Sequence, residues 1–128
     1  MSILIDTSVW IDYFRSGIRS SNLDVLIDEN LIVTNDIILV ELIPFLKVKR
    51  QFKVIDLLNN ISKLSLNIDW NEIIRFQVIC LHSGLNGIGI PDLILAQNIM
   101  QNHCSIYSFD KHFVWLKEAL DIELYETL

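Results

Sequence analysis

Residues 3–14 read ILIDTSVWIDYF, and this stretch decides how the fold is interpreted. Its three leading aliphatic residues predict a short buried strand, and the apolar segment that resumes after Ser8 predicts a helix. Asp6 stands between the two and is followed by two hydroxyl residues. A carboxylate at such a junction has two interpretations, because it can cap the helix or serve as a ligand of a metal site.

The alternation of strand and helix recurs along the chain. The predicted strands are residues 1–5, 31–34, 104–109 and 121–126, with a short strand or connection at 63–66. The predicted helices are residues 8–15, 20–30, 35–46, 49–61, 69–84 and 91–102, with a short helical turn at 117–120. Near-continuous aliphatic strands that alternate with helices indicate an α/β fold, with a mainly parallel central sheet covered by helices on both faces.

Several helix ends carry local signals. Asn35 is a cap-like residue before an apolar helix, and Pro44 is expected to end or kink that helix. Ser21 and Asp24 have the spacing of a capping box at the start of another helix. Pro91 stands at a plausible first helical position.

The composition favours one compact domain that spans residues 1–128. Hydrophobic residues make up 52% of the chain, which argues against disorder, and the longest nearly apolar run, IILVELIPFL, is too short to span a bilayer. The N-terminus has no basic start and no small-residue cleavage site, so we expect no signal peptide. Two cysteines do not make a disulfide framework, and we expect a reduced, cytoplasmic setting without membrane contact.

Four acidic residues are expected at one edge of the predicted sheet, where ligands bind in folds of this type. Asp6 follows the first strand, and Asp110 follows the strand SIYSF. Asp92 opens a helix after a glycine-rich turn, and Glu41 lies in the first two turns of the helix after LIVT. Taken singly, each aspartate also fits a structural role: Asp6 as a helix cap, Asp92 as a favourable charge near a helix N-terminus, and Asp110 as a turn residue.

Glu41 is the hardest of the four to explain as a structural residue. The other residues from Ile37 to Ile43 are all aliphatic. A glutamate in such a setting is rarely buried unless it is paired with a cation or coordinates an ion. A buried ion pair with a lysine or arginine therefore stays open beside the metal interpretation.

Four carboxylates that meet would repel one another, so such a cluster is favourable only when cations occupy it. Oxygen ligands select hard ions, which favours Mg²⁺ or Mn²⁺ over zinc. A bound ion of this kind can deprotonate a water into a nucleophile. The acids together therefore predict metal-dependent hydrolysis of a phosphodiester. With Asp6 as a ligand, Thr7 and Ser8 are expected to cap the helix instead.

The same residues carry a resemblance to a known family. ILIDTSVWIDYF, the embedded Glu41, GIPDLILAQ and YSFDKHF resemble the four motif regions of PIN-domain ribonucleases. Within that family, the chain is most similar to the VapC-type toxins of bacterial and archaeal type II toxin–antitoxin systems. The resemblance extends from Ile3 to about Leu116.

This resemblance implies a three-layer α/β/α fold and a metal-dependent endoribonuclease that acts on structured or single-stranded RNA, with tRNA and rRNA as candidate targets. Asp6, Glu41 and Asp92 match the three central acids of the family, and Asp110 matches its more variable fourth acid. In the family these acids bind one or two Mg²⁺ or Mn²⁺ ions and orient the attacking water. Ser8 matches a polar position that supports the first acid or touches phosphate.

The resemblance also implies a homodimer and a cognate antitoxin that inserts into the active-site groove. A PIN-fold nuclease that processes RNA outside a toxin–antitoxin pair is an alternative. A non-catalytic, receiver-like binding module shares the alternating pattern, but it needs an acidic pair after the first strand and an aspartate after the third. Here Thr7 and Ser8 follow Asp6, and Asp56 falls in a helical pattern, which disfavours the receiver.

A basic segment, KVKRQFK at residues 47–53, holds four of the ten lysines and arginines of a chain whose net charge is −6. It fits an RNA contact, a contact with an acidic partner or a solvated helix face. Lys111 is a candidate for holding phosphate, because it adjoins a proposed ligand. His112 and Asp12 are expected at the surface.

Overall fold

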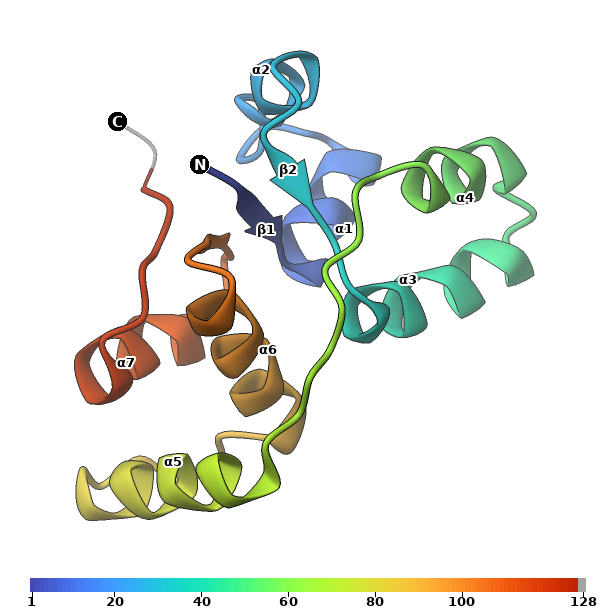
Figure 1. Ribbon diagram of the computed structural model, residues 1–128. Coiled ribbons are helices and arrows are strands. Elements are labelled where there is room, and N and C mark those ends of the chain that lie inside the picture. The colour runs from blue at the N-terminus through green and yellow to red at the C-terminus, as the bar shows by residue number, and fades with distance from the viewer. Residues whose placement is uncertain (127–128) are drawn as a thin grey trace.

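The computed structural model describes residues 1–126 and contains three strands and seven helices in that range (Figure 1). In chain order these are β1 (Ile3–Ile5), α1 (Thr7–Arg15), α2 (Leu23–Asp28), β2 (Ile32–Val33), α3 (Asp36–Val48), α4 (Phe52–Asn59), α5 (Trp70–His82), α6 (Ile90–Gln101), β3 (Ser105–Tyr107) and α7 (Lys111–Leu120). Within the described residues, none of the helices has both the length and the hydrophobicity needed to cross a bilayer.

The three strands form one parallel sheet in the order β2–β1–β3, which confirms the predicted parallel sheet. Leu4 in the central strand pairs with Val33 of β2 on one side and with Ile106 of β3 on the other. All three residues of β1 are buried, as expected for a strand covered on both faces. Because the strands run parallel, their carboxyl ends share one edge of the sheet.

Helices on both faces of the sheet complete the three-layer α/β/α fold. Figure 1 shows α3 and α4 to one side of the strands and α5, α6 and α7 to the other. α5 packs against α6 and α7, and α1 packs against α3. The residues 93–99 of α6 are all buried, so this helix lies within the core. Its position, and that of the acid in its first turn, is therefore set by packing on all sides.

α7 is much longer than the short turn predicted at residues 117–120. Its side chains Phe113, Leu116 and Leu120 are buried and give the helix one apolar face against the core. At its start, the carboxylate of Asp110 accepts a hydrogen bond from a backbone N–H of the first turn. The prediction missed this helix because its first turn carries charged and aromatic residues that do not show the apolar repeat by themselves.

The strand predicted at residues 121–126 is wrong. This segment makes a single bridge, to Ile106 of β3, and Ile122 is its one buried hydrophobic residue. It therefore has too little buried apolar surface to hold a longer pairing. Residues 63–66 likewise make a single bridge, to Thr34 beyond the end of β2, so they form a connection rather than a strand.

The two signals predicted for α3 have different outcomes. Asn35 caps the helix as predicted, because its Oδ1 accepts a hydrogen bond of 3.0 Å from the Ile38 N–H. Pro44 does not end the helix, which continues to Val48. The carbonyl that loses its partner to a proline belongs to Val40, which is 70% exposed, so water is available to it.

The capping box predicted at the start of α2 is wrong. The helix begins at Leu23, and Asn22 rather than Ser21 occupies the N-cap position, without a side-chain cap hydrogen bond. Asp24 instead accepts a hydrogen bond from the Tyr13 hydroxyl of α1. The Asp24 carboxylate, which the local pattern assigned to the end of α2, is therefore hydrogen-bonded to a residue of another helix instead.

Asp12 is not a free surface residue, contrary to the prediction. Its Oδ2 accepts hydrogen bonds from both the backbone N–H and the hydroxyl of Ser20, at 3.0 and 2.6 Å. Ser20 is fully buried. The pair ties α1 to the turn that leads into α2.

The substitution Asn35→Ala should lower the free energy of unfolding by about 1–3 kcal/mol. It removes the cap of α3 and also the 2.8 Å hydrogen bond that the Asn35 amide donates to Asn98 of α6, leaving buried polar groups unpaired. Urea unfolding measures the loss. Asn59→Ala, at an exposed position, should stay within about 0.5 kcal/mol of the wild type. Equal stability of Asn35→Ala and the wild type would contradict the assigned role.

Candidate active site

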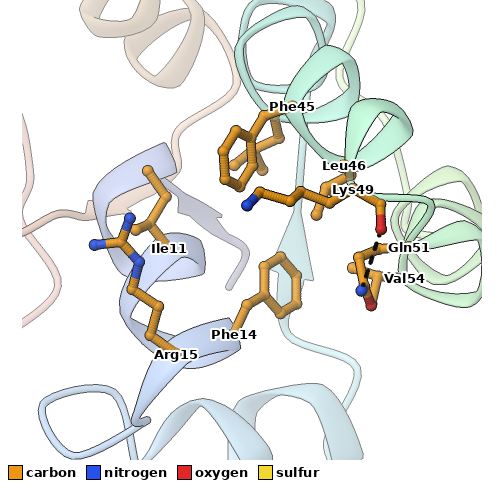
Figure 2. A pocket seen from close by; sticks show the side chains of 9 residues that line it. Ile11, Phe14, Arg15, Phe45, Leu46, Lys49, Gln51 and Val54 are labelled. Atoms are coloured by element: carbon orange, nitrogen blue, oxygen red, sulfur yellow. Dashed lines mark hydrogen bonds between the residues drawn. The ribbon is translucent and has the colours of Figure 1, made fainter.

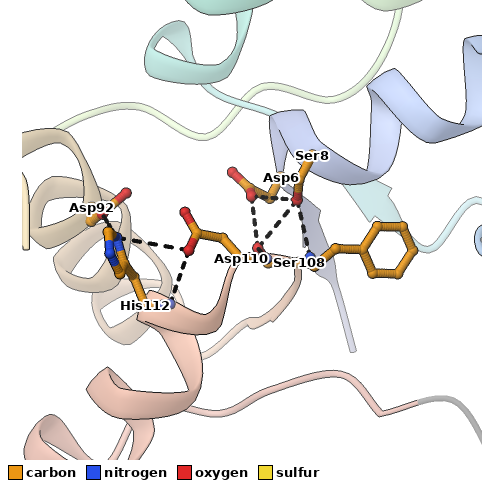
Figure 3. A network of polar contacts seen from close by, with 7 residues as sticks. Asp6, Ser8, Asp92, Ser108, Asp110 and His112 are labelled. Atoms are coloured by element: carbon orange, nitrogen blue, oxygen red, sulfur yellow. Dashed lines mark hydrogen bonds and ion pairs between the residues drawn. The ribbon is translucent and has the colours of Figure 1, made fainter.

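The carboxyl ends of β1 and β3 hold a network of polar side chains at the predicted edge of the sheet. Asp6 directly follows β1, and Asp110 occupies the N-cap position of α7, three residues after β3. Asp92 lies in the first turn of α6. Figure 3 shows these three carboxylates with the side chains that connect them. Parallel pairing therefore brings together residues that are far apart in the sequence.

Asp6 is buried, with 7% of its surface exposed, and its carboxylate is held by two serines. Its Oδ2 accepts hydrogen bonds from Ser8 at 2.8 Å and from Ser108 at 2.7 Å. The Ser108 hydroxyl also accepts a hydrogen bond of 3.0 Å from the backbone N–H of Asp110, and the Ser8 hydroxyl accepts one from the backbone N–H of Phe109. Two hydroxyl groups thus hold the Asp6 carboxylate in place beside the loop that carries Asp110.

The expectation that Thr7 and Ser8 cap the first helix is wrong. Both lie inside α1, and Asp6 occupies the N-cap position, although its side chain makes no cap hydrogen bond. The carboxylate is turned instead toward Ser8 and Ser108. Asp6 therefore has the backbone position of a helix cap, while its carboxylate belongs to the polar network at the edge of the sheet.

His112 joins the other two aspartates. Its Nδ1 lies 3.1 Å from Asp92 Oδ2 and 3.7 Å from Asp110 Oδ1. Its backbone N–H donates a hydrogen bond of 2.9 Å to the Asp110 carboxylate. The side chain is half-buried, so its predicted place at the surface is wrong. Its position in the first turn of α7, two residues after a proposed ligand, was the signal that could have identified it.

Glu41 is exposed, contrary to the expectation that its aliphatic neighbours would enclose it. The buried side chains of α3 include Ile38 and Leu42, whereas Val40 and Glu41 lie on the open side of the helix. No buried ion pair is therefore needed to explain it. The Glu41 carboxylate accepts a hydrogen bond of 3.3 Å from the hydroxyl of Thr7, which places it beside the start of α1.

The carboxylates influence one another electrostatically. Burial raises the pKa of Asp92 above its usual value; the hydrogen bond with His112 opposes this shift, and the charges of Asp110 and Asp6 add to it. Partial loss of water also raises the pKa of Glu41, with smaller upward contributions from the charges of Asp6 and Asp92. The charge of Asp6 therefore acts on both Asp92 and Glu41, and that of Asp110 acts on Asp92.

The donor atoms best arranged to hold an ion belong to Asp92, Asp110 and His112. One ligand atom from each lies within 4.8 Å of the others. Two carboxylates with one imidazole suit Mn²⁺ and are compatible with Mg²⁺, both of which prefer oxygen ligands. The structure thus brings two of the four predicted acids into one group with a histidine. Asp6 and Glu41 lie outside this group, beside it.

Lys111 is exposed and turned toward an aromatic ring rather than the acids, with its Nζ 5.4 Å from the centre of Trp115. Cys80 and Cys104 are free and buried, as suits small core residues. The residues that the sequence did not identify are Ser108 and His112. Ser108 reaches Asp6 across 102 positions, which no local pattern records, whereas the local signal for His112 was its place two residues after Asp110.

Comparisons with known proteins agree with this fold. A family model described as PIN domain matches residues 3–118. Similar solved structures include VapBC2 from Rickettsia felis bound to a DNA fragment from their promoter, with 18% identity, a TM-score of 0.77 and 100% coverage of both chains. VapBC-1 from nontypeable Haemophilus influenzae has 17% identity, a TM-score of 0.76 and 98% coverage of both chains. FitAcB from Neisseria gonorrhoeae has 19% identity, a TM-score of 0.70, and coverage of 97% of this chain and 96% of that chain. The comparison with curated proteins found no match.

The substitution Asp92→Asn should raise the free energy of unfolding at pH 7 in the presence of EDTA. The folded-state pKa of Asp92 lies above the ordinary value of 3.8, so its ionised form destabilises the folded protein at neutral pH, and an uncharged amide removes that penalty. The gain should shrink as the pH falls through the raised pKa and vanish below 3.8, where the carboxyl is protonated in both states. Urea unfolding at several pH values measures the difference.

The matched control for this measurement is Asp56→Asn, at an exposed position in α4. It should change the stability by less than about 0.5 kcal/mol at each pH. A lower stability of Asp92→Asn at pH 7 without metal would show that the carboxylate stabilises the fold and would contradict the penalty assigned to its buried charge.

Proposed function

Because the chain belongs to the PIN-domain family, we propose that it is a divalent-metal-dependent endoribonuclease that hydrolyses RNA phosphodiesters. The observation that carries this proposal is the group of two carboxylates and one imidazole at the carboxyl edge of the sheet, with donor atoms within 4.8 Å of one another. Such a set has little structural value without a cation, since its charges repel. It suits an ion that binds a phosphate oxygen and a water.

In this proposal the acids have distinct tasks. Asp92 and Asp110 hold the ion, with Asp6 and Glu41 completing its surroundings from β1 and α3. A bound Mg²⁺ or Mn²⁺ supplies charge that stabilises the phosphoryl transition state and lowers the pKa of a water. Ser8 and Ser108 hold the Asp6 carboxylate in one orientation through their hydrogen bonds. This preorganisation is what a metal ligand needs from its surroundings.

His112 is either a ligand itself or the group that orients Asp92. Its Nδ1 is 3.1 Å from the Asp92 carboxylate, a distance at which an imidazole fixes the rotation of a carboxyl group. Its backbone N–H holds Asp110 at the same time. One residue therefore contacts both acids of the group.

We also propose that the protein is the toxin of a toxin–antitoxin pair, with a cognate antitoxin as partner. The resemblance of the four motif regions to VapC-type toxins supports this, as do the similar structures named VapBC2 and VapBC-1. Self-association as a homodimer belongs to the same proposal, and light scattering of the purified protein measures it.

A nuclease that processes RNA outside a toxin–antitoxin pair would use the same site. The presence or absence of a neighbouring antitoxin gene distinguishes this alternative from the toxin. The receiver-like alternative is dropped, because the chain is a PIN domain and Asp56 lies in α4.

Purified protein freed of any partner should cleave total RNA in Mg²⁺ or Mn²⁺ and not in EDTA. Asp6→Asn and Asp92→Asn should each lower the cleavage rate by more than about 100-fold, beyond the roughly 10–100-fold loss typical of groups that only orient a ligand. Sequencing the cleaved ends gives the target and the rate together. Asp56→Asn should cleave like the wild type. Full cleavage by a folded Asp92→Asn protein would refute the proposal.

The substitution His112→Ala should lower Mn²⁺ affinity or cleavage by about 10–100-fold while leaving the fold intact. Calorimetric titration with Mn²⁺ measures affinity without relying on activity. His103→Ala is the matched control, since His103 is exposed and lies at the end of α6, away from the acids. Unchanged Mn²⁺ affinity and unchanged cleavage in His112→Ala would show that the imidazole is dispensable.

A further inference from the structure

A hollow of about 590 Å³ lies beside the segment that follows β3. One of its lining residues is Ser108, whose hydroxyl group holds the Asp6 carboxylate (Figure 3). The others include Arg19, Phe109 and Tyr125, which have no part in the proposed metal group. The hollow therefore adjoins the active site, but the chemistry proposed above does not explain it. It is separate from the groove between α1 and α3 in Figure 2, whose lining residues are different and mostly apolar.

Phe109 connects the hollow to the acids. Its backbone N–H donates a hydrogen bond of 3.0 Å to the Ser8 hydroxyl, which in turn donates one to the Asp6 carboxylate. The residue after Phe109 is Asp110, one of the two carboxylates of the metal group. A molecule that contacts the Phe109 side chain in the hollow therefore lies beside the place where the proposed reaction occurs.

Arg19 supplies a positive charge at this place. Its guanidinium carbon lies 4.0 Å from the centre of the Phe109 ring. The residue is exposed, and within residues 1–126 its guanidinium makes no ion pair with a carboxylate. An arginine can stack on an aromatic ring and still present two of its N–H groups to a phosphate. The Arg19 side chain is therefore suited to binding an anion beside the acids.

The backbone that carries Arg19 is held on both sides. Its carbonyl accepts a hydrogen bond of 3.4 Å from the hydroxyl of Tyr107 in β3. The next residue, Ser20, is fully buried and donates two hydrogen bonds to Asp12 of α1. Because the backbone is already ordered, binding a ligand costs only the conformational freedom of the arginine side chain. This preorganisation favours a binding role for the exposed cation.

Tyr125 gives the hollow an aromatic wall. Its hydroxyl accepts a hydrogen bond of 2.9 Å from the Asn22 amide, and its ring lies 4.9 Å from that of Tyr107, so the half-buried side chain is held in place. Glu126 adds a negative charge, but its carboxylate pairs with the Lys117 amine at 3.3 Å. The hollow thus combines a cation with an aromatic surface, as proteins that bind single-stranded nucleic acid do.

We propose that this hollow binds the nucleotide next to the cut phosphodiester in a single-stranded RNA. Arg19 binds the phosphate of this nucleotide, and its base lies against the ring of Tyr125. The inference rests on the proposed nuclease function and extends it by assigning residues that hold the substrate beside the metal group. An acidic peptide also matches the charge of Arg19, but a nucleotide uses both the charge and the aromatic surface, and its strand continues to the acids.

The experiment measures binding of a fluorescently labelled single-stranded RNA hexamer to the full chain by anisotropy, in an Asp92→Asn background where cleavage is expected to be lost. Arg19→Ala should weaken binding and reduce the slope of log K against log salt by about 0.7, the value for one phosphate contact on a single strand. Tyr125→Leu should weaken binding at least about fivefold, the loss expected for one stacked base.

Each of these substitutions has a matched control. Arg75→Ala removes an exposed arginine of α5 that does not line the hollow, and it should leave the affinity and the salt slope unchanged. Tyr125→Phe keeps the ring and should bind like the parent. Thermal unfolding checks that each variant is folded. If Tyr125→Leu does not fold, Arg19→Ala decides the test, because the arginine side chain is exposed.

The same variants in the otherwise wild-type protein separate the two proposals. Arg19→Ala should raise the KM for the hexamer with little change in kcat. If the wild type neither binds nor cleaves RNA, the proposed function fails and this inference fails with it. If the wild type cleaves and Arg19→Ala binds RNA like Arg75→Ala, with the same salt slope, the function stands and the inference is overturned. Loss of binding to a co-expressed partner protein, with RNA binding unchanged, would assign the hollow to a peptide and also overturn it.

Discussion

The central place of β1 between two parallel strands is the constraint on which the site depends. The pairing of β1 with β3 continues one residue past the strand, where the Asp6 N–H donates a hydrogen bond of 2.9 Å to the Tyr107 carbonyl. The next residue of the neighbouring segment is Ser108, whose hydroxyl reaches the Asp6 carboxylate. The ladder that closes the core therefore also sets the register in which Asp6 and Ser108 meet, and a slip of one residue would separate them.

The site combines rigidity with electrostatic strain. Residues 93–99 of α6 are buried, so the helix cannot shift to relieve the repulsion between Asp92 and the other acids. Burial is the main reason why the pKa of Asp92 is raised, the charges of Asp110 and Asp6 add to the shift, and the hydrogen bond with His112 offsets part of it. Proteins commonly place unfavourable charge where function requires it and compensate through the core. Here the apolar packing of α6 holds an acid where its charge is unfavourable in the absence of a cation.

Much of this organisation could be predicted from the sequence. Continuous aliphatic runs identified β1, β2 and β3, and the positions of Asp6 and Asp110 just beyond two of them predicted the edge at which they meet. What the sequence could not show depends on contacts between distant segments. Ser108 and His112 have ordinary local surroundings, and their contacts with Asp6 and Asp92 appear only once β3 lies beside β1 and α7 beside α6. The exposure of Glu41 was missed for a related reason, because a run of aliphatic residues does not reveal which side of a helix faces the core.

The separation of the site residues along the chain has a consequence for how the protein is made. Ser108 contacts Asp6 across 102 positions of sequence, and β1 has no neighbour on one side until residues 105–107 exist. A growing polypeptide on the ribosome therefore exposes Asp6, Glu41 and Asp92 early, but it lacks both the serine that orients the first acid and the imidazole that contacts the third. The network closes only when residues 105–112 have emerged, so its assembly depends on a segment made long after its first residues.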